Sequence, residues 1–310
     1  MLPICRGDHV NAICVRPKPM PVWRDPIGKE GNSLKQSTAS AAFSLALLAT
    51  SSAFAQTQPC DQEAPCLIDT GDYHMMMPPD WDGTSPLPAL VWFHGHNSKA
   101  SSIFRSGGLK ADFVNQGYVL IAPNGVKRGG GSTQSWPGRI NSTGRDDVAF
   151  TLAVLDDAKT RLPIDPERTY VAGFSAGGSM AWMMGCYAAE TFAGVVSVSG
   201  ALRRPIPQTT CPAGPFNLLQ IHGFADGQVP FEGRAIRDWH QGDIFEALGL
   251  LRATNQCRSN PDEITIGAQF RCREWSASCD NAAIKFCEHD GGHGLPRGWT
   301  ALAREWLEAQ

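Results

Sequence analysis

Residues 169–189 read TYVAGFSAGGSMAWMMGCYAA, and this stretch decides the fold. Its first four residues form a short apolar run that favours a buried strand, whereas the segment after Ser175 has the composition of a helix. Ser175 lies on the turn between them. The glycines two positions before and two positions after it remove side chains that would clash in so sharp a turn. The stretch therefore predicts a strand, a strained turn with a serine at its tip, and a helix.

Such a turn matches the G-x-S-x-G nucleophile elbow, in which the serine hydroxyl projects above a sheet. The next backbone N–H, that of Ala176, lies at a helix N-terminus and can face an oxyanion. The pentapeptide alone is a weak signal, and an ordinary glycine-rich helix start with a capping serine is the alternative. The predicted strand and helix on either side favour the nucleophilic interpretation.

The rest of the chain after residue 55 alternates short apolar runs with helical stretches, which is typical of a mainly parallel sheet covered by helices on both faces. Besides 169–172, strands are expected at 67–77 (an opening strand or hairpin), 88–94, 118–122, 194–198, 216–221 and 283–287. Helices are expected at 103–116, 146–161, 176–189, 242–254 and 299–308. The pattern predicts one α/β-hydrolase domain over residues 56–310.

A serine hydroxyl is a poor nucleophile until a base takes its proton, and a third group must orient that base. In the α/β-hydrolase fold the order along the chain is serine, acid, histidine, and reacting groups collect at the carboxyl ends of the strands. Asp226 follows the strand expected at 216–221, and His293 lies on the loop after 283–287. We therefore expect Ser175 to be the nucleophile, Asp226 the acid and His293 the base.

Other residues compete for these roles. His289 is the closest rival to His293, but it immediately follows its strand and leaves little loop to reach back to the serine. Among the aspartates, only Asp226 lies just beyond a predicted strand and before the histidine. The remaining competitors are His74, His94, His96, His222, His240, Asp238, Asp243 and Asp290.

A second oxyanion donor is expected from the loop after residues 88–94, which reads His94-Gly95-His96-Asn97. We assign the backbone N–H of His96. Two alternatives stay open: His94 and His96 could be ligands of a metal ion, as imidazoles often are, or His94 could simply tie the loop by hydrogen bonds.

The N-terminal region indicates export. An apolar stretch at 41–49 follows Lys35 and is followed by Ala53-Phe54-Ala55, so residues 35–55 are expected to be a signal peptide cleaved after Ala55. The residues before Lys35 do not resemble a signal n-region, and a wrongly assigned upstream start explains them. The apolar stretch at 41–49 is too short to cross a bilayer, and no later segment is apolar enough to do so.

Cysteine content and charge agree with a secreted or periplasmic protein. Eight of the ten cysteines follow residue 55, and an even number in an exported chain suggests disulfides. Proximity favours a bridge from Cys60 to Cys66 and leaves the other pairings open; no C-x2-C pair supports zinc. A net charge of −3 without a long basic run argues against a nucleic-acid partner.

Several motifs together resemble those of the polyhydroxybutyrate depolymerase and feruloyl esterase group of α/β-hydrolases. They read VWFHGH, GYVLIAPNG, RDDVAF, VAGFSAGGSMAW, IHGFADGQVPFEG and GGHGLP. The resemblance implies a serine esterase without cofactor or metal, with Ser175, Asp226 and His293 as its triad. It also supports the amides of His96 and Ala176 as oxyanion donors. His96 stands where many relatives have cysteine, which changes a pocket wall.

The substrate is expected to be a small or polymer-linked ester with a short acyl, feruloyl, acetyl or hydroxybutyrate group. Because no substrate-binding module follows Gln310, a crystalline polymer is not expected. Trp136, Phe224 and Trp299 are candidates for the pocket wall, although core or loop-anchoring roles suit them equally. Two other functions stay open, a metal-dependent hydrolase that uses His94 and His96 and a non-catalytic binding module. The oligomeric state is not predicted.

Overall fold

The computed structural model describes residues 4–6, 13–15, 60–127, 132–137, 144–236 and 239–310. The chain divides into two compact units, Met1–Ser52 and Ala53–Gln310. In the first, β1 (Ile4–Arg6) and β2 (Ile13–Val15) pair antiparallel. The predicted signal peptide, residues 35–55, lies outside the described residues and stays a prediction. Among the residues described, none of the helices combines the length and the apolar character that a bilayer crossing requires.

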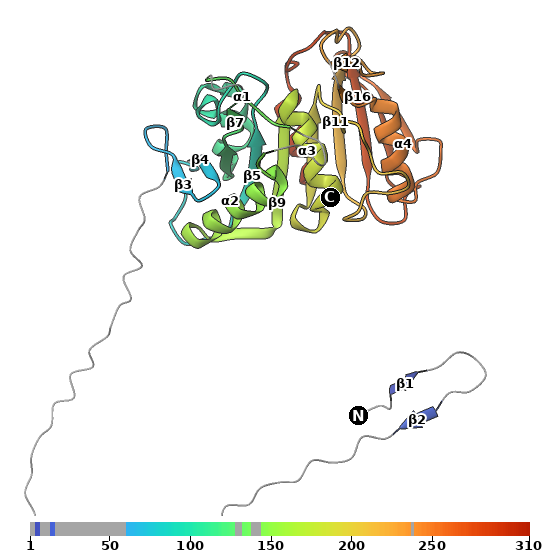
Figure 1. Ribbon diagram of the computed structural model, residues 1–310, viewed down its shortest axis with the longest axis horizontal. Coiled ribbons are helices and arrows are strands. Elements are labelled where there is room, and N and C mark those ends of the chain that lie inside the picture. The colour runs from blue at the N-terminus through green and yellow to red at the C-terminus, as the bar shows by residue number, and fades with distance from the viewer. Residues whose placement is uncertain (1–3, 7–12, 16–59, 128–131, 138–143, 237–238) are drawn as a thin grey trace, which may run out of the picture. The chain divides into compact units, whose positions relative to one another are not determined.

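The second unit is built on a ten-stranded sheet (Figure 1). Its strands are β3 (Cys66–Ile68), β4 (Gly71–Met76), β5 (Leu87–Phe93), β6 (Val119–Pro123), β9 (Ile164–Phe174), β10 (Gly194–Val198), β11 (Leu218–Gly223), β14 (Glu263–Ile266), β15 (Arg271–Trp275) and β16 (Ile284–His289). They lie in the order β14-β15-β16-β11-β10-β9-β5-β6-β4-β3. The run from β16 to β6 is parallel, and the strands outside it pair antiparallel. The carboxyl ends of β9, β11 and β16 therefore meet at one edge.

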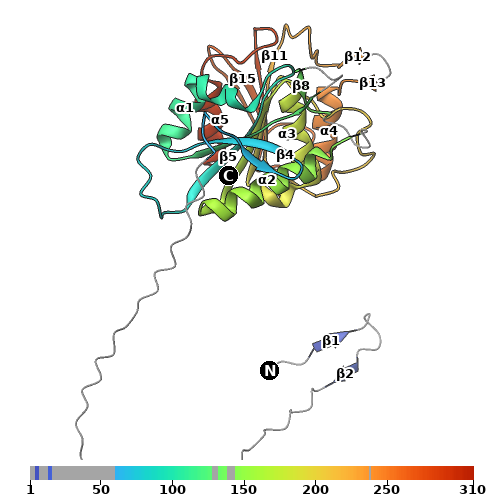
Figure 2. The ribbon, with the colours of Figure 1, turned by 60° about the vertical axis from the view of Figure 1, so that its left-hand side comes forward.

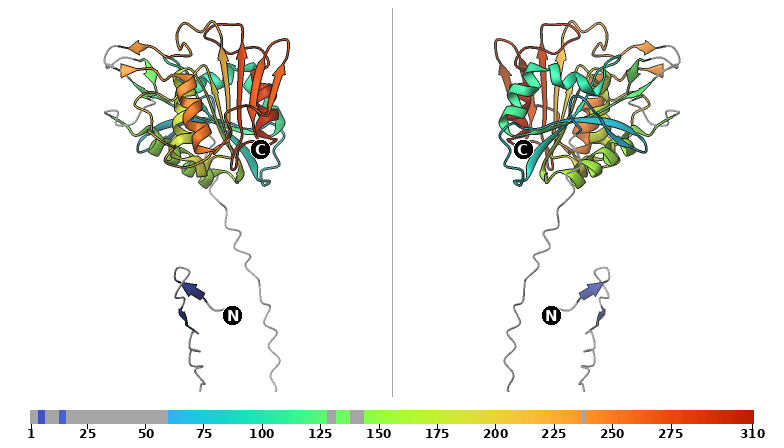
Figure 3. Two further views of the ribbon diagram at one scale, coloured as in Figure 1. Left: turned by 90° about the vertical axis from the view of Figure 1, so that its right-hand side faces the viewer. Right: turned by 90° about the vertical axis from the view of Figure 1, so that its left-hand side faces the viewer.

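Helices cover both faces of this sheet, as Figures 2 and 3 show. Side chains of α2 (Asp147–Arg161), α3 (Ala176–Tyr187) and α4 (Ile244–Thr254) join one buried cluster. Those of α1 (Gly107–Asp112) and α5 (Trp299–Leu307) join the other. Because helices cover both faces, every residue of β5, β6, β10 and β11 is buried, which explains why these strands are mainly apolar. The predicted α/β-hydrolase fold is confirmed.

The predicted helix at 103–116 is wrong in its extent. The segment divides into the 3₁₀ helix η1 (Ala100–Arg105), α1 and the 3₁₀ helix η2 (Val114–Gln116). The physical reason lies at Ser106, whose hydroxyl accepts the Leu109 N–H at 3.4 Å and begins a new helix. The two glycines that follow it also weaken a continuous helix.

The sequence reasoning did not anticipate the antiparallel strands β14 and β15 at the edge of the sheet. All four residues of β14 are exposed, so this strand has no continuous apolar run to mark it. Its alternation of polar residues with Ile264 and Ile266 is short, and both isoleucines are largely exposed. Two pairs of two-residue strands in the second unit are equally weak in sequence. They are β7 (Val126–Lys127) with β8 (Gln134–Ser135) and β12 (Ala235–Ile236) with β13 (Trp239–His240).

The expected disulfides are confirmed. Cys60 bonds to Cys66 as proximity suggested, and the other bridges are Cys186–Cys211, Cys257–Cys279 and Cys272–Cys287. The last of these joins directly opposed residues of β15 and β16. Each bridge constrains the unfolded chain, which stabilises the folded state.

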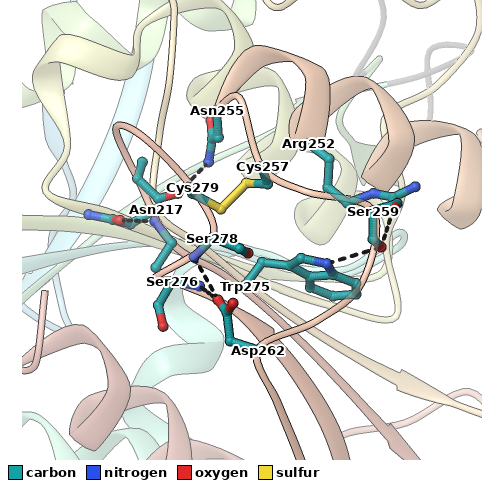
Figure 4. Close-up of a disulfide and its surroundings, with 12 residues drawn as sticks. Asn217, Arg252, Asn255, Cys257, Ser259, Asp262, Trp275, Ser276, Ser278 and Cys279 are labelled. Carbon is teal, nitrogen blue, oxygen red and sulfur yellow. Dashed lines mark hydrogen bonds between the residues drawn. A yellow bond between two sulfur atoms is a disulfide. The ribbon is translucent and has the colours of Figure 1, made fainter.

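Figure 4 shows the bridge between Cys257 and Cys279, which ties the chain after α4 to the turn after β15. Hydrogen bonds hold both segments: the Asp262 carboxylate accepts the Ser276 and Ser278 N–H groups at 2.8 and 2.9 Å. The Asn255 side chain donates to the Ala282 carbonyl at 3.0 Å. The bridge therefore fastens a region that is already well ordered by polar contacts.

Removal of this bridge in the double variant Cys257→Ser/Cys279→Ser is expected to lower the free energy of unfolding by about 3 kcal/mol, because it closes a loop of 22 residues. Urea unfolding measures the change. The matched control is Cys60→Ser/Cys66→Ser, whose loop of 6 residues is expected to contribute about 2 kcal/mol. A larger loss from the shorter loop would contradict the loop-closure account.

Candidate active site

Ser175 lies in a strained turn between β9 and α3, with a backbone φ of 57°. Such a conformation costs of order 1–3 kcal/mol in a non-glycine residue and persists only where the surroundings enforce it. Around Ser175 the enforcing contacts come from backbone atoms. A Cβ at Gly177 would lie 2.0 Å from the Phe93 carbonyl oxygen, and one at Gly173 would lie 2.2 Å from that of Gly177. The two glycines let β9, α3 and the end of β5 approach closely enough to hold the turn.

The structure brings Ser175, Asp226 and His293 into a hydrogen-bonded line. His293 Nε2 lies 2.9 Å from Ser175 Oγ, and His293 Nδ1 lies 2.8 Å from Asp226 Oδ2. The three residues follow β9, β11 and β16, whose parallel directions place them at the same edge of the sheet. A carboxylate only accepts hydrogen bonds, so Nδ1 carries the imidazole proton and Nε2 can accept the serine proton.

Asp226 is 5% exposed and accepts hydrogen bonds at both oxygens. Oδ1 accepts the backbone N–H groups of Gln228 at 2.9 Å and Val229 at 2.8 Å. Burial raises the pKa of this carboxyl, but hydrogen bonds from His222, His293 and the Val229 amide outweigh burial and hold the pKa well below its usual range. Asp226 is therefore an anion at neutral pH.

Two backbone hydrogen bonds join the loop that carries Asp226 to the loop that carries His293. Phe224 N–H donates to the His289 carbonyl at 2.7 Å, and Ala225 N–H donates to that of Gly291 at 3.1 Å. His289 Nδ1 accepts the Gly291 N–H at 3.1 Å, and burial lowers the pKa of this imidazole. The rival histidine thus supports the loop rather than facing the serine.

His94 ties the loop after β5. Its Nε2 accepts the Gly125 N–H at 3.0 Å, and its Nδ1 lies 2.8 Å from the Gly95 carbonyl oxygen. Trp136 donates its indole N–H to the His94 carbonyl at 2.9 Å. Both ring nitrogens thus face backbone groups, so the loop-tying interpretation of His94 explains this residue better than metal ligation does. No group of three or more potential metal ligands lies together among the residues that the structure describes.

Protonation of His94 is expected to destabilise the fold. Burial is the main reason why the pKa of His94 falls from 6.5 to about 4. The charge of Arg145 lowers this pKa further, whereas the hydrogen bond with the Gly95 carbonyl raises it. The unfolded chain therefore binds more protons than the folded one between these values, so stability falls as the pH is lowered through this window. The loss is about 3 kcal/mol.

The matched variant for this prediction is His94→Gln, which cannot titrate. Urea unfolding of both proteins between pH 7 and pH 4 isolates the contribution of His94, since other groups cancel in the difference. The stability difference between the two proteins is expected to shrink towards pH 4. A difference that does not change with pH would contradict the account.

The two expected oxyanion donors lie on different segments, since Ala176 directly follows Ser175 and His96 lies on the loop after β5. Ala176 is the first residue of α3, so its N–H is one of the amides that a helix start leaves without an intrahelical acceptor. His96 is exposed on the loop after β5, and this loop touches the elbow, because a Cβ at Gly95 would lie 3.2 Å from the Phe174 ring. The position of the two residues is compatible with the expected role, which stays a prediction.

The predicted pocket residues differ in their positions. Trp136 is fully buried against Phe93 and His94, so it belongs to the core and cannot line a pocket. Trp299 is 6% exposed and packs against Trp92 with ring centroids 5.3 Å apart. Phe224 is 68% exposed beside Asp226. Side-chain direction, which the sequence does not reveal, accounts for the differences.

A cleft of about 300 Å³ lies beside the elbow. Phe174, which precedes Ser175, and Leu295, which follows His293 by two residues, contribute to its wall. The Phe174 ring also packs against the His293 ring in a tilted arrangement, with ring centroids 5.0 Å apart. The other lining residues are Trp92, His94, Gly95, His96, Ser98, Ser102, Ile103, Arg105, Ser106 and Leu109. The sequence did not single out Leu295 or the residues of η1 as part of a pocket wall. Leu295 could have been considered, because it lies only two residues after His293.

A mainly parallel sheet with a serine elbow and an aligned aspartate and histidine at its carboxyl edge defines an α/β-hydrolase. The family model described as BD-FAE matches residues 75–222. The match spans just under half of the chain, so the chain is similar to this family over that region and has the α/β-hydrolase fold.

Individual proteins are also similar to this chain. NocK of Nocardia uniformis is 35% identical over 146 residues, which span 47% of this chain and 42% of NocK. Feruloyl esterase C of Emericella nidulans is 24% identical over 242 residues, 74% of this chain and 79% of that enzyme. An acetyl xylan esterase from Aspergillus awamori has the same fold, with a TM-score of 0.59, 14% identity and coverage of 77% of this chain and 94% of that one.

Proposed function

We propose that the protein is a serine esterase that hydrolyses carboxylic esters through an acyl-enzyme on Ser175. The observation that carries the proposal is the continuous hydrogen-bonded line from Ser175 Oγ through His293 to Asp226, with contacts of 2.9 and 2.8 Å. Similarity to feruloyl esterases supports an ester substrate. The four disulfides among the described residues support an extracellular or periplasmic location.

In the proposed mechanism His293 takes the Ser175 proton as Oγ attacks the ester carbonyl. The backbone N–H groups of Ala176 and His96 stabilise the developing oxyanion, and each such donor lowers the barrier by about 2.7–4 kcal/mol. Asp226 holds the imidazole tautomer and stabilises the imidazolium. The imidazolium then gives its proton to the leaving alcohol, and water attacks the acyl-enzyme by the same route.

The cleft beside the elbow is the site proposed for the acyl or aryl group. Its apolar side chains, among them Phe174, Ile103 and Leu295, suit an aromatic or aliphatic group better than a charged one. Feruloyl, acetyl and short acyl esters are the proposed substrates, and hydroxybutyrate oligomers are included because of the sequence resemblance.

The test is a panel of purified-protein assays with p-nitrophenyl acetate, methyl ferulate, acetylated xylan and hydroxybutyrate oligomers, with Ser175→Ala as the blank. Hydrolysis that Ser175→Ala abolishes supports the proposal, and the substrate with the highest kcat/KM defines its class. Hydrolysis at the same rate by Ser175→Ala, or by neither protein, would overturn it.

Narrowing the cleft is expected to change the preference of the enzyme among ester substrates. Leu295 is 44% exposed at its wall, so Leu295→Trp adds bulk without disturbing the core. We expect kcat/KM for methyl ferulate to fall by about 10-fold or more relative to p-nitrophenyl acetate, since a mismatch of a few heavy atoms is worth about 1–3 kcal/mol. Ile264→Trp on the exposed edge strand β14 is the matched control. An unchanged ratio would show that the aryl group binds elsewhere.

A further inference from the structure

A second, fully buried line of polar side chains lies beneath the proposed triad. Trp182 on α3 and Gln220 and His222 on β11 have no exposed surface. The Trp182 indole N–H donates to Gln220 Oε1 at 2.7 Å, and Gln220 Nε2 lies 3.1 Å from His222 Nδ1. Polar groups buried so deeply are costly unless each finds a partner, so this line calls for an explanation.

The chemistry of these groups fixes the proton on His222. An indole N–H can only donate, so the Gln220 oxygen must face Trp182 and its NH₂ must face the other way. That NH₂ donates to the Gly200 carbonyl at 3.1 Å and to His222 Nδ1. His222 Nδ1 is therefore an acceptor, and the imidazole proton resides on Nε2.

The proton on Nε2 points at the turn that holds Asp226. Nε2 lies 2.8 Å from the Val229 carbonyl oxygen and 3.4 Å from Asp226 Oδ2. The Val229 N–H in turn donates to Asp226 Oδ1 at 2.8 Å. The His222 imidazole thus donates its hydrogen bond to the end of the turn and faces the Asp226 carboxylate at a longer distance. The carboxylate accepts a hydrogen bond from the same turn at its other oxygen.

We infer that His222 is a positioning residue of the active site, which acts through Asp226 by fixing the 226–229 turn and the carboxylate within it. This inference rests on the proposed function, because it concerns the acid of the triad. Trp182 and Gln220 hold the imidazole in the required tautomer, and they couple the core of α3 to the carboxylate that orients His293.

The variant His222→Leu removes the donor and keeps the site apolar. Because a displacement of about 1 Å in a catalytic group can cost about 10²-fold, we expect kcat to fall by about that factor while KM changes by less than about 2-fold. His222→Gln restores an N–H at the position of Nε2 and is expected to recover at least about tenfold of this loss.

The matched control is His74→Leu. His74 is also a buried histidine whose Nδ1 lies 2.5 Å from a backbone carbonyl, that of Asp61. It lies on β4, which β6, β5, β9 and β10 separate from β11. His74→Leu is expected to lower the melting temperature without lowering kcat. Titration of active molecules with an organophosphate normalises kcat for any fraction that does not fold.

A double-mutant cycle with Asp226→Asn provides the decisive reading. A residue that acts through Asp226 loses its effect once Asp226 is replaced, so His222→Leu is expected to lower kcat by less than about 3-fold in that background. Additive losses, or a kcat of His222→Leu equal to that of the wild type, would overturn the inference. Ser175→Ala in the same series separates the two claims, since activity that survives it would defeat the proposed function instead.

Discussion

Ser175→Ala is expected to lower kcat for ester hydrolysis by about 10⁶-fold, to the level left by binding and the oxyanion donors alone. The substitution removes the oxygen that would bond to the acyl group, and it removes the hydroxyl proton that His293 Nε2 would accept. The Ser175 hydroxyl makes a single side-chain contact among the described residues, at 2.9 Å to His293 Nε2. The loss is therefore chemical rather than structural.

The melting temperature distinguishes a chemical from a structural cause of the lost activity. The Ser175 backbone makes the hydrogen bonds that hold the elbow, its N–H donating to the Val198 carbonyl at 2.8 Å, and alanine keeps that bond. The melting temperature of Ser175→Ala is therefore expected to stay within a few degrees of the wild type. A normal melting temperature with substantial remaining activity would show that Ser175 is not the nucleophile.

Asp226→Asn is expected to lower kcat by about 10⁴-fold. The reason lies in the donors around the carboxylate. Oδ1 faces two backbone N–H groups, those of Gln228 and Val229, and Oδ2 faces His293 Nδ1. An amide has one oxygen, which the two backbone donors claim, so its NH₂ turns to His293. The imidazole then accepts at Nδ1, carries its proton on Nε2, and can no longer accept the proton of Ser175.

The matched control for this prediction is Asp290→Asn. Asp290 was a competing acid in the sequence, but its side chain is 88% exposed and pairs with Arg271 on the surface at 2.8 Å. Its replacement is expected to leave kcat within about 2-fold, since exposed ion pairs contribute about 0–1 kcal/mol. A large loss in Asp290→Asn together with a small one in Asp226→Asn would reverse the assignment of the acid.

The interior of the sheet could be predicted because burial on both faces leaves a direct trace in sequence. β5, β6, β10 and β11 are buried along their whole length, and their sequences are mainly apolar, with Ser197, Gln220 and His222 as the polar exceptions. The exposed edge strand β14 leaves no such trace. The prediction of one helix at 103–116 was wrong for a local reason. The spacing of the apolar residues favours a single helix, but Ser106 caps a new helix inside the segment.

The candidate site divides in the same way. The proximity of Ser175, Asp226 and His293 could be predicted because each follows a strand end, and chain topology brings strand ends together. Pocket residues could not be placed, because their role depends on side-chain direction. Trp136 thus lies in the core while Leu295, which the sequence did not single out, lines the cleft. The part played by His222 depends on a tautomer, which only its hydrogen-bond partners reveal.

The most direct test of the central claim is covalent labelling of the nucleophile. The protein is incubated with diethyl p-nitrophenyl phosphate, which phosphorylates activated serines, and its residual activity and intact mass are followed together. The account predicts the addition of one diethylphosphoryl group per molecule, located on Ser175 by peptide mass spectrometry, with activity lost in proportion. Labelling at another residue, or full activity in a fully labelled protein, would contradict it.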